Sequence, residues 1–252
     1  MRGVARQRRR LVLAGLALVL GAGLGAGLAP AQDAWPGGGE RLFSARGCAA
    51  CHAVLGPVPL LAVAAREAER GPALWDAGNK FRPAWLRTWL EKPTLIRQVR
   101  YGTLEKGTNP HPALRAEEAE AIAAYLLTLR DPGVPTGLIP SGPPPKPVER
   151  RALILFLKKQ PCYACHQVRI RKDQNVTPRV VGGFTGPSLV EAGRRLNGDW
   201  VYAFLKDTPR YSPNGRMPFF GDRPETRFSE QDYRDLAAFV ASLGAPDGKR
   251  GN

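Results

Sequence analysis

The chain has 252 residues, enough for one or two domains, and 43% of them are hydrophobic. This composition excludes both a disordered tail and a polytopic membrane protein. The net charge is +15, of which +7 lies in residues 148–252. The basic excess is either a solvated surface or a means of steering towards an acidic protein patch or anionic lipid. Basic residues interleaved with aromatic ones are lacking, which argues against nucleic acid as a partner.

Residues 1–31 have the order of a secretory signal. Five arginines precede an uncharged run over residues 11–29, and Ala29-Pro30-Ala31 is a small-x-small cleavage sequence. The uncharged run has 19 residues, so it is also just long enough to span a bilayer. Cleavage after Ala31 and retention as an N-terminal anchor both remain open. Either outcome predicts a periplasmic or other extracytoplasmic location.

The first predicted domain covers residues 32–130. A short apolar helix is expected at residues 40–46, directly before the run Cys48-Ala-Ala-Cys51-His52. A second helical segment begins at Gly71 and reads GPALWDAGNKFRPAWLRTWL. The last helix of this half has one apolar stripe at helical spacing, formed by Ile122, Tyr125, Leu126 and Leu129.

Residues 131–147 read DPGVPTGLIPSGPPPKP. Proline and glycine at this density neither continue a helix nor fit a central strand. The composition therefore predicts a semi-rigid linker between two domains.

The second predicted domain, residues 148–252, repeats the first. A helix is expected at residues 148–159, and the two Cys-x-x-Cys-His runs lie 114 residues apart. The segment GPSLVEAGRRLNGDWVYAFL from Gly186 matches the one from Gly71 without a gap, 115 residues later. The two final helices are again 114 residues apart. Three matching blocks in one order indicate an internal duplication, with each half a small all-α domain.

The final helix of the second half has clear boundary signals. Ser229 with Asp232 three residues later is typical of a capping box, and Gly244 is a suitable stop. Its apolar stripe repeats that of the first half and consists of Leu236, Phe239, Val240 and Leu243.

Every cysteine of the chain lies in a Cys-x-x-Cys-His run, as Cys48, Cys51, Cys162 and Cys165. In an exported protein this run indicates covalent haem attachment, because two thiols add to the two vinyl groups of one porphyrin and the histidine binds its iron. A zinc ribbon needs its pairs about 15–20 residues apart, whereas 110 residues separate Cys51 from Cys162. Two disulfides remain an alternative in an oxidising compartment.

The order of motifs in each half resembles a class I cytochrome c domain. The shared features are a first helix, Cys-x-x-Cys-His, a Gly-Pro-x-Leu loop, a helix with tryptophan, a Met-Pro loop and a last amphipathic helix. The resemblance covers about residues 38–130 and 148–244. It implies an all-α chain of two tandem domains, each around one covalently bound haem c, with His52 and His166 on the irons. It also implies that the carbonyls of Pro72 and Pro187 accept hydrogen bonds from these imidazoles.

The two halves differ in their second iron ligand. Met217, in NGRMPFF, matches the Met-Pro loop and is expected to bind the second haem iron. The first half contains no methionine in residues 32–130 and so departs from the family. Its spare histidine, His111 in NPHPALRAEE, is expected to bind the first haem iron opposite His52. Tyr101, Lys106 and an open iron remain as alternatives.

Other side chains have two interpretations each. Trp85 and Trp200 align between the halves and pack either near the haems or in the core. Four basic side chains lie in the two repeated segments that begin at Gly71 and Gly186. They are expected to be solvated rather than paired with haem propionates, and they are Lys80, Arg82, Arg194 and Arg195.

No catalytic group remains once the ligands are assigned, so the sequence predicts an electron carrier and not an enzyme. We expect a dihaem cytochrome of an extracytoplasmic respiratory chain, as a soluble carrier or as the cytochrome subunit of a membrane oxidoreductase complex. Its partners would be redox proteins with an acidic docking face. Thioether ligation favours ferrous iron, so the second haem should have the higher potential and pass electrons on.

Two other functions remain open at this point. A dihaem cytochrome c peroxidase also combines a methionine-ligated haem with one whose histidine ligand can leave, and peroxide turnover would identify it. A haem-based gas sensor needs a stable open iron, which carbon monoxide binding would detect.

Overall fold

The computed structural model describes residues 38–61, 71–99, 105–108, 111–170, 179–221 and 228–244. These residues all belong to one compact unit, Trp35–Asn252. The predicted signal or anchor at residues 1–31 lies outside the described part of the chain. Within the described part, no helix is both long and apolar enough to cross a membrane.

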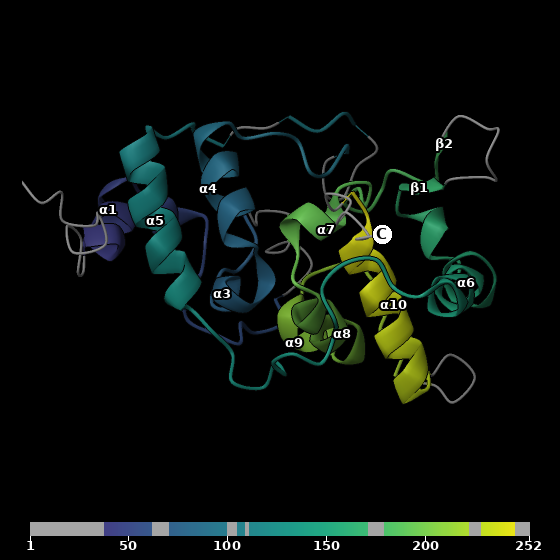
Figure 1. Ribbon diagram of the computed structural model, residues 1–252. Coiled ribbons are helices and arrows are strands. Elements are labelled where there is room, and N and C mark those ends of the chain that lie inside the picture. The colour runs from purple at the N-terminus through teal and green to yellow at the C-terminus, as the bar shows by residue number, and fades with distance from the viewer. Residues whose placement is uncertain are drawn as a thin grey trace, which may run out of the picture. The chain divides into compact units, whose positions relative to one another are not determined.

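The first half is helical, as predicted (Figure 1). Its helices are α1 (Gly38–Ala45), a 3₁₀ turn (Cys48–Ala50), α3 (Ala77–Lys80), α4 (Pro83–Glu91) and α5 (Ala116–Thr128). Proline at the first position of α4 suits a helix start, because the amide that proline lacks has no partner there. Helix α5 packs against α1, α3 and α4. Its predicted stripe faces this core, with Ile122 and Leu126 buried.

The second half repeats this arrangement. Its helices are α6 (Lys146–Ile154), a π turn (Leu155–Lys159), a 3₁₀ turn (Cys162–Ala164), α7 (Ala192–Arg195), α8 (Gly198–Lys206), α9 (Thr208–Tyr211) and α10 (Glu230–Ser242). Helix α10 packs against α6, α7 and α8. The capping box of Ser229 and Asp232 is present, and Gly244 ends the helix with a φ of 66°. All four residues of the predicted stripe are buried.

One element departs from the all-α prediction. Strands β1 (Val168–Ile170) and β2 (Arg179–Val181) form a short antiparallel hairpin just after the second Cys-x-x-Cys-His run, with Val168 opposite Val181. With three residues each, these strands are too short to show an alternating pattern in the sequence. The fold class is still all-α, because the helices supply the core.

The proline-rich segment is irregular and packs closely on the second half. Asp199 of α8 accepts hydrogen bonds from the amides of Gly137 and Ile139, each at 2.7 Å. Val134 and Ile139 are buried in the apolar core. The segment thus passes over α8 instead of spanning solvent.

The two halves meet through a short antiparallel bridge between Phe81 and Leu196. The amide of Arg82 donates to the carbonyl of Arg195 at 2.9 Å, and the amide of Asn197 donates to the carbonyl of Lys80 at 3.0 Å. We call this contact the junction. It has further side-chain contacts, among them the indole of Trp200 donating to Asp76 at 2.6 Å.

Candidate haem-binding sites

Each Cys-x-x-Cys-His run forms one tight turn. In the first, the amides of Cys51 and His52 both donate to the carbonyl of Cys48 at 3.1 Å. In the second, the amides of Cys165 and His166 donate to the carbonyl of Cys162 at 3.2 and 3.0 Å. The turn places the two cysteines and the histidine of each run on one short stretch of backbone, which suits attachment to one porphyrin.

The four cysteine side chains are free thiols. All four lie in the described part of the chain, and none forms a disulfide, which removes the disulfide alternative. In the same residues, which include every histidine, no three His, Cys, Asp or Glu side chains form a metal-binding group, so a zinc site is not present either. Burial raises the pKa of Cys48, and that of Cys162 to about 11. Both thiols are therefore neutral, and both side chains pack against the apolar core.

The two histidines of these runs are oriented by backbone carbonyls. Nδ1 of His52 donates to the carbonyl of Pro72 at 2.7 Å, and Nδ1 of His166 donates to that of Pro187 at 2.8 Å. These are the hydrogen bonds that the family resemblance implied. They leave Nε2 of each ring as the atom able to bind a metal. Burial lowers the pKa of both histidines, which favours the neutral imidazole that ligation requires.

Two glycines shape the space beside these imidazoles. A Cβ at Gly71 would lie 2.5 Å from Cε1 of His52, and a Cβ at Gly186 would lie 2.8 Å from Cε1 of His166. Any larger residue would therefore push the ring out of place. This role was not predicted, although a glycine stands at the same position of both repeats.

The ring of His111 lies near that of His52, although 59 residues separate the two histidines in the sequence. Their ring centroids are 6.3 Å apart. A first-row metal binds an imidazole nitrogen at about 2.0–2.1 Å and the centroid lies about 1.1 Å further on, so two imidazoles on opposite sides of one metal have centroids about 6.2–6.4 Å apart. The observed separation lies within this range, so His52 and His111 are the residues that would hold one metal between them.

An aromatic stack that begins just before α4 contacts His111. Phe81, Trp85 and Trp89 stack in turn with centroids 5.3 and 5.7 Å apart, and Trp89 lies 4.6 Å from His111. The spacing of four residues puts Trp85 and Trp89 on one face of α4, and Phe81, just before the helix, continues the stack. Trp85, which was expected near a haem or in the core, thus belongs to a stack that ends on a candidate ligand.

Lys106 and Tyr101 were the other candidate ligands of the first iron. Lys106 is exposed and pairs with Val99 through an isolated backbone bridge. Tyr101 lies outside the described residues. Met217, the candidate for the second iron, lies between α9 and α10, half-buried against the apolar core.

These residues fit one c-type haem in each half: two thiols, an oriented imidazole and a cradle cleared by glycine. The family model for cytochrome c matches residues 38–130 and 150–244. The chain belongs to the cytochrome c family. Comparison with curated proteins found no match, and comparison with solved structures found none either.

As a member of this family with two matched segments, the protein carries two covalently bound haem c groups and transfers electrons through them. The haem supplies redox chemistry at its iron. The chain supplies the attachment, the ligand orientation and the apolar surroundings.

The cations near the junction do not all behave as predicted. Arg195 was expected to be solvated, but only 9% of it is exposed, because the first half covers it at the junction. Arg194 beside it is exposed and pairs with Glu191 at 3.0 Å, as expected for a solvated residue. Arg82 is half-buried, and its Nε donates to the carbonyl of Leu196 at 3.1 Å. Lys80 has its ammonium 4.7 Å from the ring centroid of Trp200.

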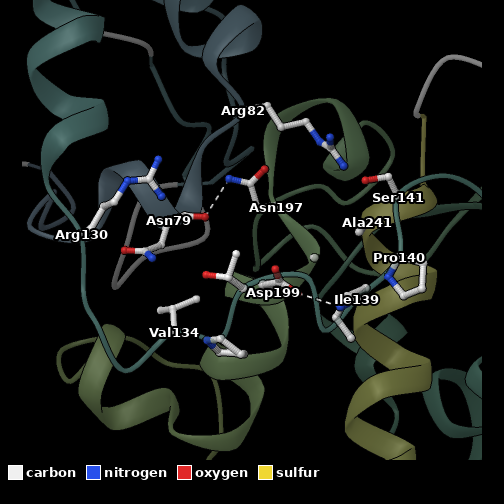
Figure 2. Close-up of a pocket in the computed structure, with 13 residues that line it drawn as sticks. Asn79, Arg82, Arg130, Val134, Ile139, Pro140, Ser141, Asn197, Asp199 and Ala241 are labelled. Carbon is white, nitrogen blue, oxygen red and sulfur yellow. Dashed lines mark hydrogen bonds between the residues drawn. The ribbon is translucent and has the colours of Figure 1, made fainter.

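A small polar cavity of about 150 Å³ lies beside the junction and is separate from both haem sites (Figure 2). Asn79, Arg82 and Arg130 line it from the first half, and Asn197 and Asp199 from the second. Figure 2 shows the amide of Asn197 donating to the carbonyl of Asn79, at 2.8 Å. No cysteine or histidine lines this cavity, so it is not a haem pocket. It lies where residues of both halves and of the linker come together.

Proposed function

We propose that this protein is a dihaem electron carrier of an extracytoplasmic respiratory chain, with His52 and His111 on the first iron and His166 and Met217 on the second. The observation that carries the proposal is the 6.3 Å separation of the His52 and His111 rings. Six-coordinate iron has no open position for a substrate, so such a site passes electrons and does not activate peroxide or bind gases.

The proposed second ligand of the second iron is Met217. Met217 belongs to a Met-Pro loop, and its half-burial against the core suits a thioether ligand. Because a thioether stabilises ferrous iron more than an imidazole does, the second haem would have the higher potential. Electrons would enter at the first haem and leave from the second.

The setting follows from the basic charge and the N-terminal segment. Residues 148–252 have a net charge of +7, which favours docking of a redox protein through an acidic face. A signal-like segment at residues 1–31 supports export. Depending on whether that segment is cleaved, the protein acts as a soluble carrier or as the cytochrome subunit of a membrane oxidoreductase complex.

Electron paramagnetic resonance of the ferric holoprotein tests the proposal. We expect two low-spin signals, one typical of His/His and one of His/Met ligation. The His111→Ala variant should convert the first signal to high spin, whereas Lys106→Ala, at an exposed residue, should change neither. A stoichiometric high-spin signal in the wild-type protein, with peroxide turnover, would identify a dihaem peroxidase instead.

A further inference from the structure

The segment that leads to Met217 contacts the first half of the chain. It starts with α9 and ends at the methionine, and we call residues 208–217 the ligand segment. Three of its side chains, those of Arg210, Tyr211 and Asn214, contact residues outside the second half. Asn214 comes only three residues before Met217.

Helix α9 is attached to the end of the first half. Asp131, three residues after α5, is almost fully buried and accepts hydrogen bonds from Nε and Nη2 of Arg210 at 2.8 and 3.0 Å. The hydroxyl of Tyr211 donates to the same carboxylate at 2.9 Å. The ring of Tyr211 also stacks on that of Trp75, with centroids 5.8 Å apart and planes 1° from parallel. Both rings are buried, so polar contacts and packing together fix α9 on the first half.

Asn214 makes the contact closest to the methionine. Only 5% of this residue is exposed, although asparagine is usually a surface residue. Its Oδ1 accepts from the amide of Leu61 at 2.8 Å, and its Nδ2 donates more weakly to the carbonyl of Pro59 at 3.4 Å. Both partners lie on the loop that follows His52. Because a buried polar group left without a partner is unfavourable, these bonds fix the ligand segment and that loop together.

A tight turn connects Asn214 with Met217. The amide of Gly215 donates to the carbonyl of Ser212 at 3.0 Å, and a Cβ at Gly215 would lie 2.3 Å from Oγ of Ser212. Three residues of chain span at most about 11 Å, so the position of Asn214 restricts that of the methionine. Met217 itself is half-buried and packs against the apolar core.

The equivalent segment of the first half makes a reciprocal contact. Under the offset of 115 residues, Tyr211 corresponds to Ile96, whose carbonyl accepts from the amide of Ser188 at 3.1 Å. Nearby, the side chain of Gln98 donates to that of Gln167. Ser188 and Gln167 directly follow Pro187 and His166. Each half therefore contacts the haem site of the other through the same part of the repeat.

We propose that Asn214 is a positioning residue for Met217, through which the first half holds the methionine in place for ligation of the second iron. A thioether stabilises ferric iron less than an imidazole does, so its ligation in the ferric state depends more on how the chain holds it. The second haem site is then complete only when the first half is docked on the ligand segment. This inference rests on the proposed ligation of the second iron by Met217.

The test is titration of the ferric holoprotein with imidazole, followed by the sulfur-to-iron charge-transfer band typical of His/Met haem. Imidazole binds the iron only when the thioether has left, so its apparent affinity rises with the fraction of protein in which Met217 is displaced. Asn214→Ala should raise that affinity about two- to tenfold, the effect of losing one hydrogen bond. Asn214→Asp keeps an oxygen that accepts from Leu61 and should remain close to the wild type.

Asn197→Ala is the matched control. It removes hydrogen bonds from another asparagine to the carbonyls of Asn79 and Phe81, at 2.8 and 3.2 Å, which also join the two halves but lie outside the ligand segment. Its imidazole affinity should equal that of the wild type. An unchanged affinity in Asn214→Ala, or an equal rise in Asn197→Ala, would overturn the positioning role.

Two further results separate this inference from the proposal on which it rests. A wild-type protein without the charge-transfer band would overturn the assignment of Met217 and the positioning role with it. A wild-type band combined with an unchanged Asn214→Ala would overturn the positioning role alone. If Asn214→Ala fails to retain its second haem, Tyr211→Phe decides the matter. This variant keeps the ring on Trp75 but loses the bond to Asp131, so its imidazole affinity should rise, and an unchanged affinity would count against the role of the first half.

Discussion

Replacing Gly186 with alanine should raise the reduction potential of the second haem without removing the haem. A Cβ at this position would lie 2.8 Å from Cε1 and 2.9 Å from Nδ1 of His166. Non-bonded carbon atoms prefer a separation of about 3.5–4.0 Å, so the imidazole must move by about 0.7 Å. That movement stretches the 2.8 Å hydrogen bond from Nδ1 to the carbonyl of Pro187. The bond would then exceed the usual limit of about 3.2 Å.

The size of the effect follows from that hydrogen bond. It increases the basicity of the imidazole, which stabilises ferric iron, so its loss favours the ferrous form. A hydrogen bond of this kind contributes about 0.5–1.5 kcal/mol. If all of that energy distinguishes the two oxidation states, the potential rises by about 20–65 mV.

Spectroelectrochemical titration of the holoprotein measures this shift, and the duplication provides the control. A Cβ at Gly71 would lie 2.5 Å from Cε1 of His52, so Gly71→Ala should shift the first haem and leave the second unchanged. A lower potential, or the same haem shifting in both variants, would refute the reasoning. So would an unchanged potential with both haems intact.

Three further predictions concern stability and ligand order. Asp131→Asn should lower the free energy of unfolding by about 2 kcal/mol at pH 7, less than for a fully buried pair, because the side chain of its partner Arg210 is 37% exposed. Arg210 holds the pKa of Asp131 below its ordinary value, so the stabilisation is present above about pH 4 and is lost as the pH falls towards the folded-state pKa. Denaturant titrations should therefore give different free energies of unfolding for the two proteins at pH 7 and similar ones in acid. A difference between the two proteins that grows in acid would contradict this. Trp89→Leu removes the ring 4.6 Å from His111 and should increase the high-spin fraction of the first ferric haem, as seen by electron paramagnetic resonance; an unchanged spectrum would show that the stack does not hold the ligand. Ser229→Ala removes the N-cap of α10 and should destabilise the protein by about 1 kcal/mol in chemical denaturation, whereas Ser242→Ala, at the other end of the helix, should change stability by less than about 0.5 kcal/mol.

Features that depend on neighbouring residues could be predicted from the sequence. The two Cys-x-x-Cys-His turns, the capping box of Ser229 and the apolar stripe of α10 all follow from spacings of a few residues, which backbone geometry converts directly into positions. The duplication followed from constant offsets between matching blocks. The hydrogen bonds of Pro72 and Pro187 to the histidines followed from the family resemblance and are present.

Features that depend on packing between distant segments could not be predicted in this way. The sequence offered His111 as a spare ligand, but only the tertiary structure brings its ring to 6.3 Å from that of His52. Arg195 was expected on a solvated helix face but is buried. Its helix has only four residues, so the sequence shows no periodicity from which a buried face could be inferred. The first half covers it, and so the surroundings of one haem site depend on the other half of the chain. Spacing along the chain determines local turns and helix faces, whereas burial and charge at the junction depend on which surfaces the folded halves present to each other.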